Sequence, residues 1–202
     1  MTKKTFKNHW EAKAYRKKFV MYVIATIILL ILMPFGFDFI ESRGGLLWND
    51  LVLNLLPAFD LSIPIFVAIY SLGLLFILRV NKNPHLLLLF IKSYIIVTLT
   101  RFVLIYFIPL DPPFGMVELA DPITKIFYGG KVITRDLFFS GHTSTMFLIF
   151  LVLEKKSDKL IALSITIFIA VSLIFQHIHY TADVLAAFPI TWLIWKLTSS
   201  ED

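Results

Sequence analysis

The sequence predicts an all-α integral membrane protein, with six transmembrane helices in a bundle and both termini in the cytoplasm. Of the 202 residues, 58% are hydrophobic and only 16% are charged, whereas a soluble domain of this size needs more polar side chains to cover its surface. The strict alternation of apolar and polar residues that is typical of a β-barrel is absent from the sequence. The composition therefore excludes a secreted, cytosolic or disordered protein and argues against two globular domains.

Six apolar runs approach the length of about 20 residues that a helix needs to cross a membrane. We expect a basic, amphipathic cytoplasmic segment at residues 1–18, a single six-helix transmembrane domain at 19–197 and a short cytoplasmic tail at 198–202. Because no small-x-small cleavage site follows the first run, we interpret that run as a retained anchor and not as a signal peptide. The six runs are Phe19–Phe37, Leu61–Leu78, Leu86–Leu110, Leu137–Leu153, Leu160–Gln176 and Tyr180–Leu197.

The distribution of Lys and Arg predicts the orientation of these spans. Thirteen of the 19 basic residues fall in segments on the same side as the amino terminus, and four fall on the other side. By the positive-inside rule, both termini are expected in the cytoplasm. The same asymmetry accounts for the formal net charge of +5, so the charge gives no support to a role in binding nucleic acid.

Two outer connections are longer than turns. In the first, the segment Leu46–Pro57 is too polar to span a membrane and too apolar for a free loop, which predicts an interfacial helix. In the second, Phe127–Ile133 contains Gly129-Gly130 and predicts a small hairpin. The chain has no cysteine, which excludes disulfides, thiolate nucleophiles and thiolate metal sites.

His179 and Asp183 are the first candidate functional pair, since ionisable groups near hydrocarbon are costly and often functional. If the last helix begins near Gln176, these two residues share a helix face, and the carboxylate can orient the imidazole as a nucleophile or base. His177 then points elsewhere on that helix. The alternative is a helix cap with a satisfied partner.

A second polar patch is formed by Ser140-Gly141-His142-Thr143, shortly after Asp136. Gly permits close approach of a substrate, and the first N–H groups of a helix attract anions. His142 would suit proton donation to a leaving oxygen. The alternative is a helix start that is capped by Asp136 and packs through small residues.

Two arginines are candidate ligands of an anion. Arg101 lies about 12 Å inside Pro109 if the helix rises 1.5 Å per residue, which is deep for a side chain that must reach water. Arg135 is either a second phosphate ligand or part of a loop salt bridge. Lys92 would face the opposite side of its helix and is interpreted as a packing residue or one that reaches the cytoplasmic interface.

These residues resemble a known family. Ser140-Gly141-His142-Thr143, followed by the His-x-His-Tyr-x-x-Asp stretch from His177 to Asp183, resembles the two core motifs of the type 2 phosphatidic acid phosphatase superfamily, and specifically its sphingomyelin-synthase-related branch. Arg101 and the following run to Pro109 are similar to that branch's arginine motif, and Asn54–Asp60 is loosely similar to its first motif.

The resemblance extends over roughly Asn54 to Trp195, with two departures from the phosphatase pattern. Lys92 and Arg101 do not form the Lys-x6-Arg-Pro motif, and Leu173 stands where phosphatase members have Arg. Both departures fit the synthase-related branch. The sequence is also shorter than those of eukaryotic sphingomyelin synthases, and we expect no counterpart of their amino-terminal interaction domain.

The resemblance implies a catalytic transmembrane domain that cleaves or transfers a phospho-head group of a lipid at the extracytoplasmic face. It implies His179 as the nucleophile that forms a phosphohistidine, with Asp183 orienting it and His142 as acid and base. Phosphate would be bound by Arg101, Arg135 and Ser140, with Asp136, His177 and Tyr180 as accessory residues. No metal or cofactor is expected, and the expected partners are membrane lipids: a phospholipid donor and an acceptor such as ceramide or diacylglycerol.

Other functions remain open at this stage. A lipid phosphate phosphatase would use the same residues with water as acceptor. A proton-coupled transporter would use buried His and Asp as a proton relay, but inverted repeats with broken helices are not visible. A catalytically silent lipid-binding protein and a homo-oligomer are also compatible with the sequence, which does not identify the head group.

Overall fold

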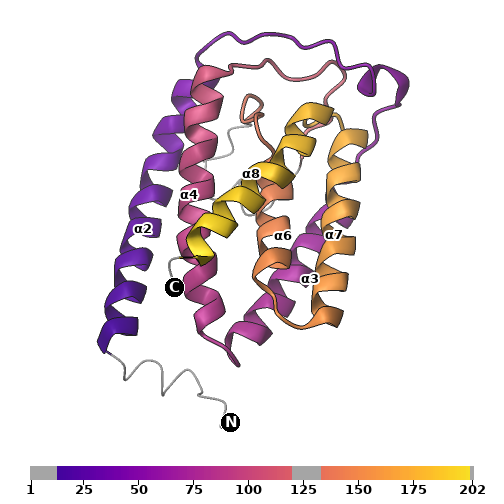
Figure 1. Cartoon of the computed structure of the whole chain (residues 1–202). Helices are drawn as coiled ribbons and strands as arrows, with labels where there is room; N and C mark the ends of the chain where they lie inside the picture. The colour runs from indigo at the N-terminus through magenta and orange to yellow at the C-terminus, as the bar shows by residue number, and fades with distance from the viewer. Residues whose placement is uncertain (1–12, 120–132, 201–202) are drawn as a thin grey trace.

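The computed structural model describes residues 13–119 and 133–200, and the regular structure in these two ranges is helical (Figure 1). Within them the chain forms six α-helices and one short 3-10 helix, η1, and the β-type pairing that occurs is a single bridge between Leu46 and Leu110. The elements are α2 (Lys13–Glu41), η1 (Leu53–Leu55), α3 (Ser62–Val80), α4 (His85–Phe107), α6 (Gly141–Val152), α7 (Lys156–Phe175) and α8 (Thr181–Ser199). The sequence prediction of an all-helical membrane protein is thus supported, while the position of the termini stays a prediction.

The shortest of the described α-helices, α6, lies at the centre of the bundle and contacts α3, α4, α7 and α8. Figure 1 shows α2 beside α4 at one edge, α3 and α7 near the other edge, and α8 crossing the bundle obliquely. The largest apolar core packs side chains of α3, α6 and α7, among them Leu72, Leu148 and Ile169, all three fully buried. The central position of α6 brings its first turn close to the ends of several other helices.

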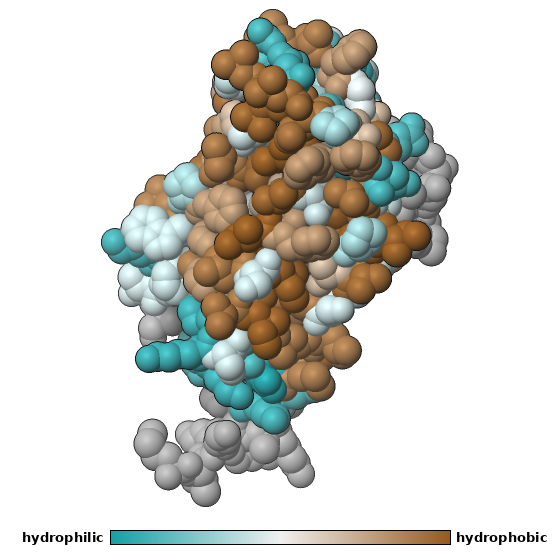
Figure 2. All heavy atoms as spheres, turned by 90° about the vertical axis from the view of Figure 1, so that its right-hand side faces the viewer, coloured by the Kyte–Doolittle hydropathy of each residue, from teal (hydrophilic) through white to brown (hydrophobic). Residues whose placement is uncertain are grey.

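Within residues 13–119 and 133–200, four helices are long and apolar enough to cross a membrane: α2, α3, α4 and α7. Figure 2 shows the face on the side of α3 and α7, where hydrophobic residues cover most of the middle and hydrophilic residues gather at the lower end, with others near the top and at the sides. The helix α6 has 12 residues, which at 1.5 Å per residue extends over about 18 Å of a hydrocarbon core about 30 Å thick. The multi-pass arrangement therefore rests on four long apolar helices, and the count of six spans stays a prediction.

Five of the six predicted spans agree with the observed helices to within four residues at each end, whereas α2 begins six residues before the predicted Phe19. Two of the differences have clear causes. The third span was predicted to continue to Leu110, but α4 ends at Phe107, because Pro109 disfavours a helical conformation at the residue before it. The fourth was predicted to begin at Leu137, but α6 begins at Gly141. There the backbone of residues 139 and 140 bonds to other helices: Phe139 O accepts a hydrogen bond from Arg101 and Ser140 N–H donates to Asp183 O.

The interfacial helix predicted at Leu46–Pro57 is wrong, since in this segment only Leu53–Leu55 forms a short 3-10 helix. Leu46 pairs instead with the chain after α4, donating to Pro109 O at 2.9 Å and accepting from Asp111 N–H at 3.1 Å. The Asp50 carboxylate accepts hydrogen bonds from the N–H groups of Val52 and Leu53. Such local hydrogen bonds from a side chain to the backbone compete with the backbone hydrogen bonds of an α-helix.

Two further predictions fall wholly or partly outside the described residues. The hairpin at Phe127–Ile133 falls almost entirely in the undescribed range 120–132. The amphipathic segment at residues 1–18 is described only from Lys13, and residues 13–18 form the first turns of α2.

Candidate active site

The centre of the candidate site is a buried pair, His179 and Asp183, at the start of α8. The His179 side chain is 4% exposed and the Asp183 side chain is fully buried, and 3.5 Å separates His179 Nδ1 from Asp183 Oδ2. This separation fits an ion pair but not a hydrogen bond, and neither His179 Nδ1 nor Asp183 Oδ1 has a hydrogen-bond partner among the described residues. Catalytic hydrogen bonds are often long in the absence of substrate. The Asp183 carboxylate therefore lies beside His179 Nδ1, where it can stabilise a positive charge on the imidazole.

The geometry that joins His179 to Asp183 differs from the predicted one. The helix begins at Thr181 and not near Gln176, so the two residues do not share a helix face. Asp183 is instead the third residue of the helix, and its Oδ2 accepts a hydrogen bond from Tyr180 N–H at 3.0 Å. This back-bond satisfies an N–H group at the helix start and directs the carboxylate toward the preceding residue, His179. The sequence analysis treated a helix cap and a His179–Asp183 pair as alternatives, but in the structure Asp183 both caps α8 and lies beside His179.

The first turn of α6 lies directly against this pair. Ser140, which is fully buried, caps α6 by accepting a bond from Thr143 N–H at 3.4 Å, so the alternative in which Asp136 caps this helix does not apply. Ser140 N–H donates to Asp183 O at 3.1 Å, which joins the starts of α6 and α8. His142, the second residue of α6, therefore belongs to a helix turn that contacts the His179–Asp183 region.

Arg101 reaches the same helix start from α4. Its Nε donates to Phe139 O at 2.7 Å and one Nη donates to Asp136 Oδ1 at 2.8 Å. A Cβ atom added at Gly141 would lie 2.5 Å from Nη1 of Arg101, so only glycine allows the guanidinium to approach α6 this closely. The sequence predicted that Arg101 binds an anion, and the Asp136 carboxylate is one such partner. Nη1 of Arg101 has no hydrogen-bond partner among the described residues.

Arg135 lies away from this cluster, although it precedes Asp136 in the sequence. Its Nε donates to Asp111 Oδ1 at 2.8 Å and its Nη1 donates to Glu41 O at 2.6 Å. The structure thus shows the loop salt bridge that the sequence left as one of two alternatives. Contact between Arg135 and a phosphate stays a prediction.

His177 is also separate from the pair, and it does not lie on α8 as predicted. It follows α7 in the connection to α8 with a φ of 55°, a left-handed conformation that is uncommon for a residue with a side chain. Its Nδ1 lies 3.1 Å from Phe114 O. Tyr180, the other predicted accessory residue of this connection, donates from its hydroxyl to Asp111 O at 2.9 Å.

Sequence reasoning missed Asp50, which holds the start of α8 from the first outer connection. Asp50 Oδ2 accepts from Thr181 N–H at 2.6 Å, and Oδ1 accepts from the Thr181 hydroxyl at 3.1 Å. Burial alone would raise the pKa of Asp50, but the hydrogen bonds from Thr181, Leu53 and Val52 lower it below its ordinary value. Nothing local in the sequence indicates a contact between residues 50 and 181.

Among the described residues, no group of three or more His, Asp or Glu side chains is arranged to hold a metal ion. The chemistry derived for the site is that of its imidazoles, its carboxylate and its guanidinium. These groups can provide a nucleophile, proton transfer and binding of an anion.

Residues 135–200 match the family model of the PAP2 superfamily C-terminal domain. The matched range contains Ser140, His142, His179 and Asp183 but not Arg101. The match supports the PAP2 superfamily and indicates phosphatase or phosphotransferase chemistry on lipid phosphates in a multi-pass membrane protein. No curated protein matches the chain.

Proposed function

We propose that this protein is a membrane enzyme that transfers or hydrolyses the phospho-head group of a lipid through a phosphohistidine on His179. The observation that carries the proposal is the buried His179–Asp183 pair, held against a helix start that also receives Arg101. A nucleophile with an orienting carboxylate, next to an anion-binding helix start, is an arrangement that suits phosphoryl transfer through a covalent intermediate. The synthase-related branch of the superfamily belongs to this proposal.

In the first step, His179 attacks phosphorus, a P–N bond forms and the bond from phosphorus to the leaving oxygen breaks. The imidazole becomes positively charged as the bond forms. Asp183, whose Oδ1 has no described partner, stabilises that charge and orients the ring. His142 gives its proton to the leaving oxygen, so that the leaving group departs as an alcohol.

In the second step, His142 takes the proton of an alcohol or of water while its oxygen attacks phosphorus and the P–N bond breaks. A lipid alcohol as acceptor, such as ceramide or diacylglycerol, yields a new phospholipid, whereas water yields the free phospho-head group or phosphate. The residues at the site are the same for both outcomes, so access of the second substrate decides between transfer and hydrolysis.

The phosphate oxygens would be bound by the start of α6 together with Arg101. The first N–H groups of a helix point outward and carry a partial positive charge. Nη1 of Arg101 lies against Gly141 in that turn, and Asp136 holds the guanidinium in place at 2.8 Å. Hydrogen-bond donors that already point to where negative charge develops usually lower the activation barrier more than any other single effect.

We also propose that the site opens to the extracytoplasmic side. Support comes from the bias of basic residues, thirteen against four. Cysteines introduced at the exposed residues Ser42 and Ser157 of this cysteine-free chain test the orientation in intact cells with an impermeant maleimide. Labelling at position 42 alone is expected, whereas labelling at position 157 alone would place the chemistry in the cytoplasm.

The reaction itself is tested by incubating the purified protein with labelled phospholipids and lipid phosphates, with and without ceramide or diacylglycerol. We expect release of a phospho-head group or phosphate without acceptor, and a new phospholipid when the lipid alcohol is added. If every alcohol leaves the products unchanged, the protein is a lipid phosphohydrolase and not a transferase.

The role of His179 is tested by His179→Ala, which should abolish the covalent phospho-intermediate and reduce turnover by at least about 10⁴-fold. His85→Asn, at the exposed first residue of α4, is the matched control and should keep full activity. Normal turnover of His179→Ala would disprove the nucleophile assignment.

A further inference from the structure

Glu41, the last residue of α2, joins that helix to the segment that leads into α6. One oxygen of its carboxylate, Oε1, accepts hydrogen bonds from Thr134 N–H and Arg135 N–H, both at 2.6 Å. The other oxygen, Oε2, accepts from the Thr134 hydroxyl at 3.0 Å. The Arg135 guanidinium donates to Glu41 O at 2.6 Å. Glu41 thus makes four hydrogen bonds with two consecutive residues that lie 93 and 94 positions away in the sequence.

The charge of Glu41 is not explained by the stability of α2. The C-terminal end of a helix carries a partial negative charge, so a carboxylate there is unfavourable, and the last turn of α2 contains no basic residue to offset it. The N–H groups of Thr134 and Arg135 supply the compensating interaction, since hydrogen bonds to an ionised oxygen are roughly twice as strong as neutral ones. The carboxylate therefore serves the contact with residues 134 and 135 and not the helix that contains it.

The segment 133–137, as the structure describes it, has no helical or strand structure that would fix its position. Contacts with neighbouring helices do so instead. Ile133 packs against apolar residues near the ends of α2 and α4, and Glu41 holds the next two residues. Asp136 follows directly and bonds to Arg101 at 2.8 Å. The Asp136 carboxylate is therefore carried by a segment that α2 holds in place.

The direction of the Arg101 side chain depends on the same segment. Its Nη2 donates to Asp136 Oδ1 at 2.8 Å, and its Nε donates to Phe139 O at 2.7 Å. These two bonds direct Nη1 to Gly141, in the first turn of α6. A shift of residues 134–136 would move the Asp136 carboxylate and, with it, the guanidinium.

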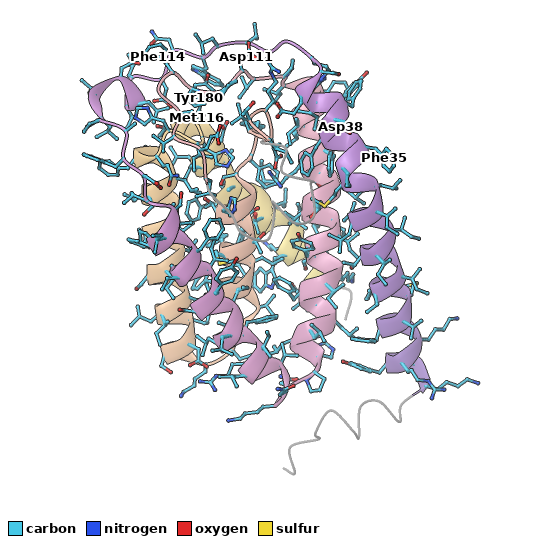
Figure 3. All side chains as sticks on the ribbon, turned by 180° about the vertical axis from the view of Figure 1, so that it is seen from behind. Phe35, Asp38, Asp111, Phe114, Met116 and Tyr180 are labelled. Carbon is cyan, nitrogen blue, oxygen red and sulfur yellow. The ribbon has the colours of Figure 1, made fainter. Side chains whose placement is uncertain are left out.

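The end of α2 has few other routes to the site. Figure 1 shows α2 at the edge of the bundle, and among the described helices it packs mainly against α4. Figure 3 shows Asp38, in the last turn of α2, at the end of the molecule where Asp111 and Tyr180 also lie. The Arg135 guanidinium extends the link, since its Nε donates to Asp111 Oδ1 at 2.8 Å. Hydrogen bonds of the segment before α6 thus connect α2 to the start of that helix.

We propose that Glu41 is a positioning residue for phosphate binding: it holds residues 134 and 135 so that Asp136 directs Arg101 toward the first turn of α6. The inference rests on the proposed function, because it takes Arg101 and that turn as the place where a phosphate group binds. Glu41 touches neither the phosphate nor the reacting atoms. Its role makes α2, a peripheral helix, necessary for the site.

Phosphate binding to the purified full-length protein tests the proposal without turnover. The thermal unfolding midpoint is recorded against the concentration of inorganic phosphate, with potassium chloride of equal ionic strength as the control, and the apparent Kd follows from the shift. Glu41→Ala should weaken phosphate binding by at least about tenfold. The sign of the change is informative, because loss of a negative charge by itself would strengthen anion binding or leave it unchanged.

Glu41→Gln is the conservative variant. Its amide oxygen can still accept from both N–H groups, and its NH2 group can donate to the Thr134 hydroxyl, so phosphate binding should stay within about threefold of the wild type. If Glu41→Ala does not fold, Glu41→Asp, which keeps the charge but withdraws the carboxylate by one methylene group, should show the weakening instead. The matched control is Glu154→Ala, which removes an exposed carboxylate that bonds to Asn83 in the connection between α6 and α7; it should bind phosphate as the wild type does.

A double-mutant cycle with Arg101→Lys separates positioning from a general loss of stability. Lysine lacks the planar guanidinium that bonds to both Asp136 and Phe139, so Glu41→Ala should have little further effect on phosphate binding in this background. A contribution that does not act through Arg101 would give the same factor in both backgrounds. In the turnover assay with labelled lipid phosphates, Glu41→Ala should lower kcat/KM per folded molecule by at least about tenfold, and Glu41→Gln should restore most of it.

Three results would overturn the proposal: unchanged or tighter phosphate binding in Glu41→Ala, equal factors in the two Arg101 backgrounds, or no phosphate binding by the wild type. The proposed function fails separately. Phosphate binding that depends on Glu41, without turnover of any lipid, would keep the positioning role and remove the enzyme. Turnover that persists undiminished in Glu41→Ala would keep the enzyme and remove the positioning role.

Discussion

Two buried carboxylates near opposite ends of the bundle are satisfied in different ways. Asp158, at the start of α7, is 3% exposed and makes two hydrogen bonds with Arg79 of α3, at 2.5 and 3.1 Å. Asp183, at the start of α8, is fully buried, receives one hydrogen bond from Tyr180 N–H and has His179 at 3.5 Å. The first carboxylate is neutralised by a cation of the protein, and the second has an oxygen without a described partner.

The difference separates a structural ion pair from the pair that we propose as the reactive site, where positive charge would develop during the reaction. A two-point Arg–carboxylate pair is geometrically complete and joins α3 to α7. A buried carboxylate without a full partner is costly by itself, and it becomes favourable when a neighbouring imidazole gains a positive charge. The comparison predicts that the same substitution at the two positions affects activity at one and stability at the other.

The largest effect is expected for Asp183→Asn. Asparagine can still accept the hydrogen bond from Tyr180 N–H, so the helix start should persist, but the negative charge that we propose stabilises the imidazolium of His179 is lost. Turnover should fall by roughly 10³–10⁴-fold, with little change in the thermal unfolding midpoint. Full activity in this variant would reduce Asp183 to a capping residue.

The next effect concerns the contact between Arg101 and α6. In Gly141→Ala the new Cβ would lie 2.5 Å from Arg101 Nη1, and the guanidinium must move from the position where it would contact phosphate. Steady-state kinetics should show a loss of about 10²-fold. The control is Gly73→Ala in α3, where an added Cβ meets no atom within 4 Å; equal losses in both variants would argue against the role of Arg101.

A change in stability without a change in chemistry is expected for Asp158→Asn. The substitution removes the charged partner of Arg79 at the end of the bundle away from the site. The thermal midpoint should fall by a few degrees, because one member of a largely buried ion pair is left unpaired. Turnover per folded molecule should equal that of the wild type, and a selective loss of turnover would contradict the structural assignment.

The smallest effect is a pH dependence from Asp50. Its lowered pKa in the folded protein means that its ionised form contributes stability above the ordinary pKa of about 3.8, and that this contribution is lost as the pH falls through the folded value. Asp50→Asn should therefore flatten the dependence of the thermal midpoint on pH below about 4. Because Asp50 is partly exposed, the difference should be small; identical pH profiles would show that its hydrogen bonds with Thr181 do not affect stability.

The length of the apolar runs predicted the helices well. Helices such as α3 and α7 coincide with apolar segments that end at charged or polar residues. Boundaries failed where backbone groups bond across the molecule, as at residues 137–140, which were predicted to be helical. There Phe139 O accepts a hydrogen bond from Arg101, and Ser140 N–H donates to Asp183 O. The interfacial helix failed for a similar reason, because Asp50 and Leu46 bond to segments distant in sequence. Local propensity cannot represent such contacts.

The residues of the site divide in the same way. The motifs singled out His142, His179 and Asp183 because polar and ionisable groups beside long apolar runs are conspicuous. The separation of His177 from the pair, the loop contacts of Arg135 and the capping of α8 by Asp50 depend on which loops lie together, and a single sequence contains no signal for that.

The sequence by itself determined that the chain is a helical membrane protein with a small set of polar groups among apolar runs, because transfer of apolar surface from water depends on composition and run length. Only the tertiary structure decided which of those groups meet. Arg101 approaches Gly141, Ser140 bonds to Asp183, and Asp50 bonds to Thr181 across 131 positions, because the packing of α4, α6 and α8 brings their ends together. Short-range hydrogen bonds and ion pairs depend on distances of a few ångströms, which the packing of the helices sets and the order of residues does not.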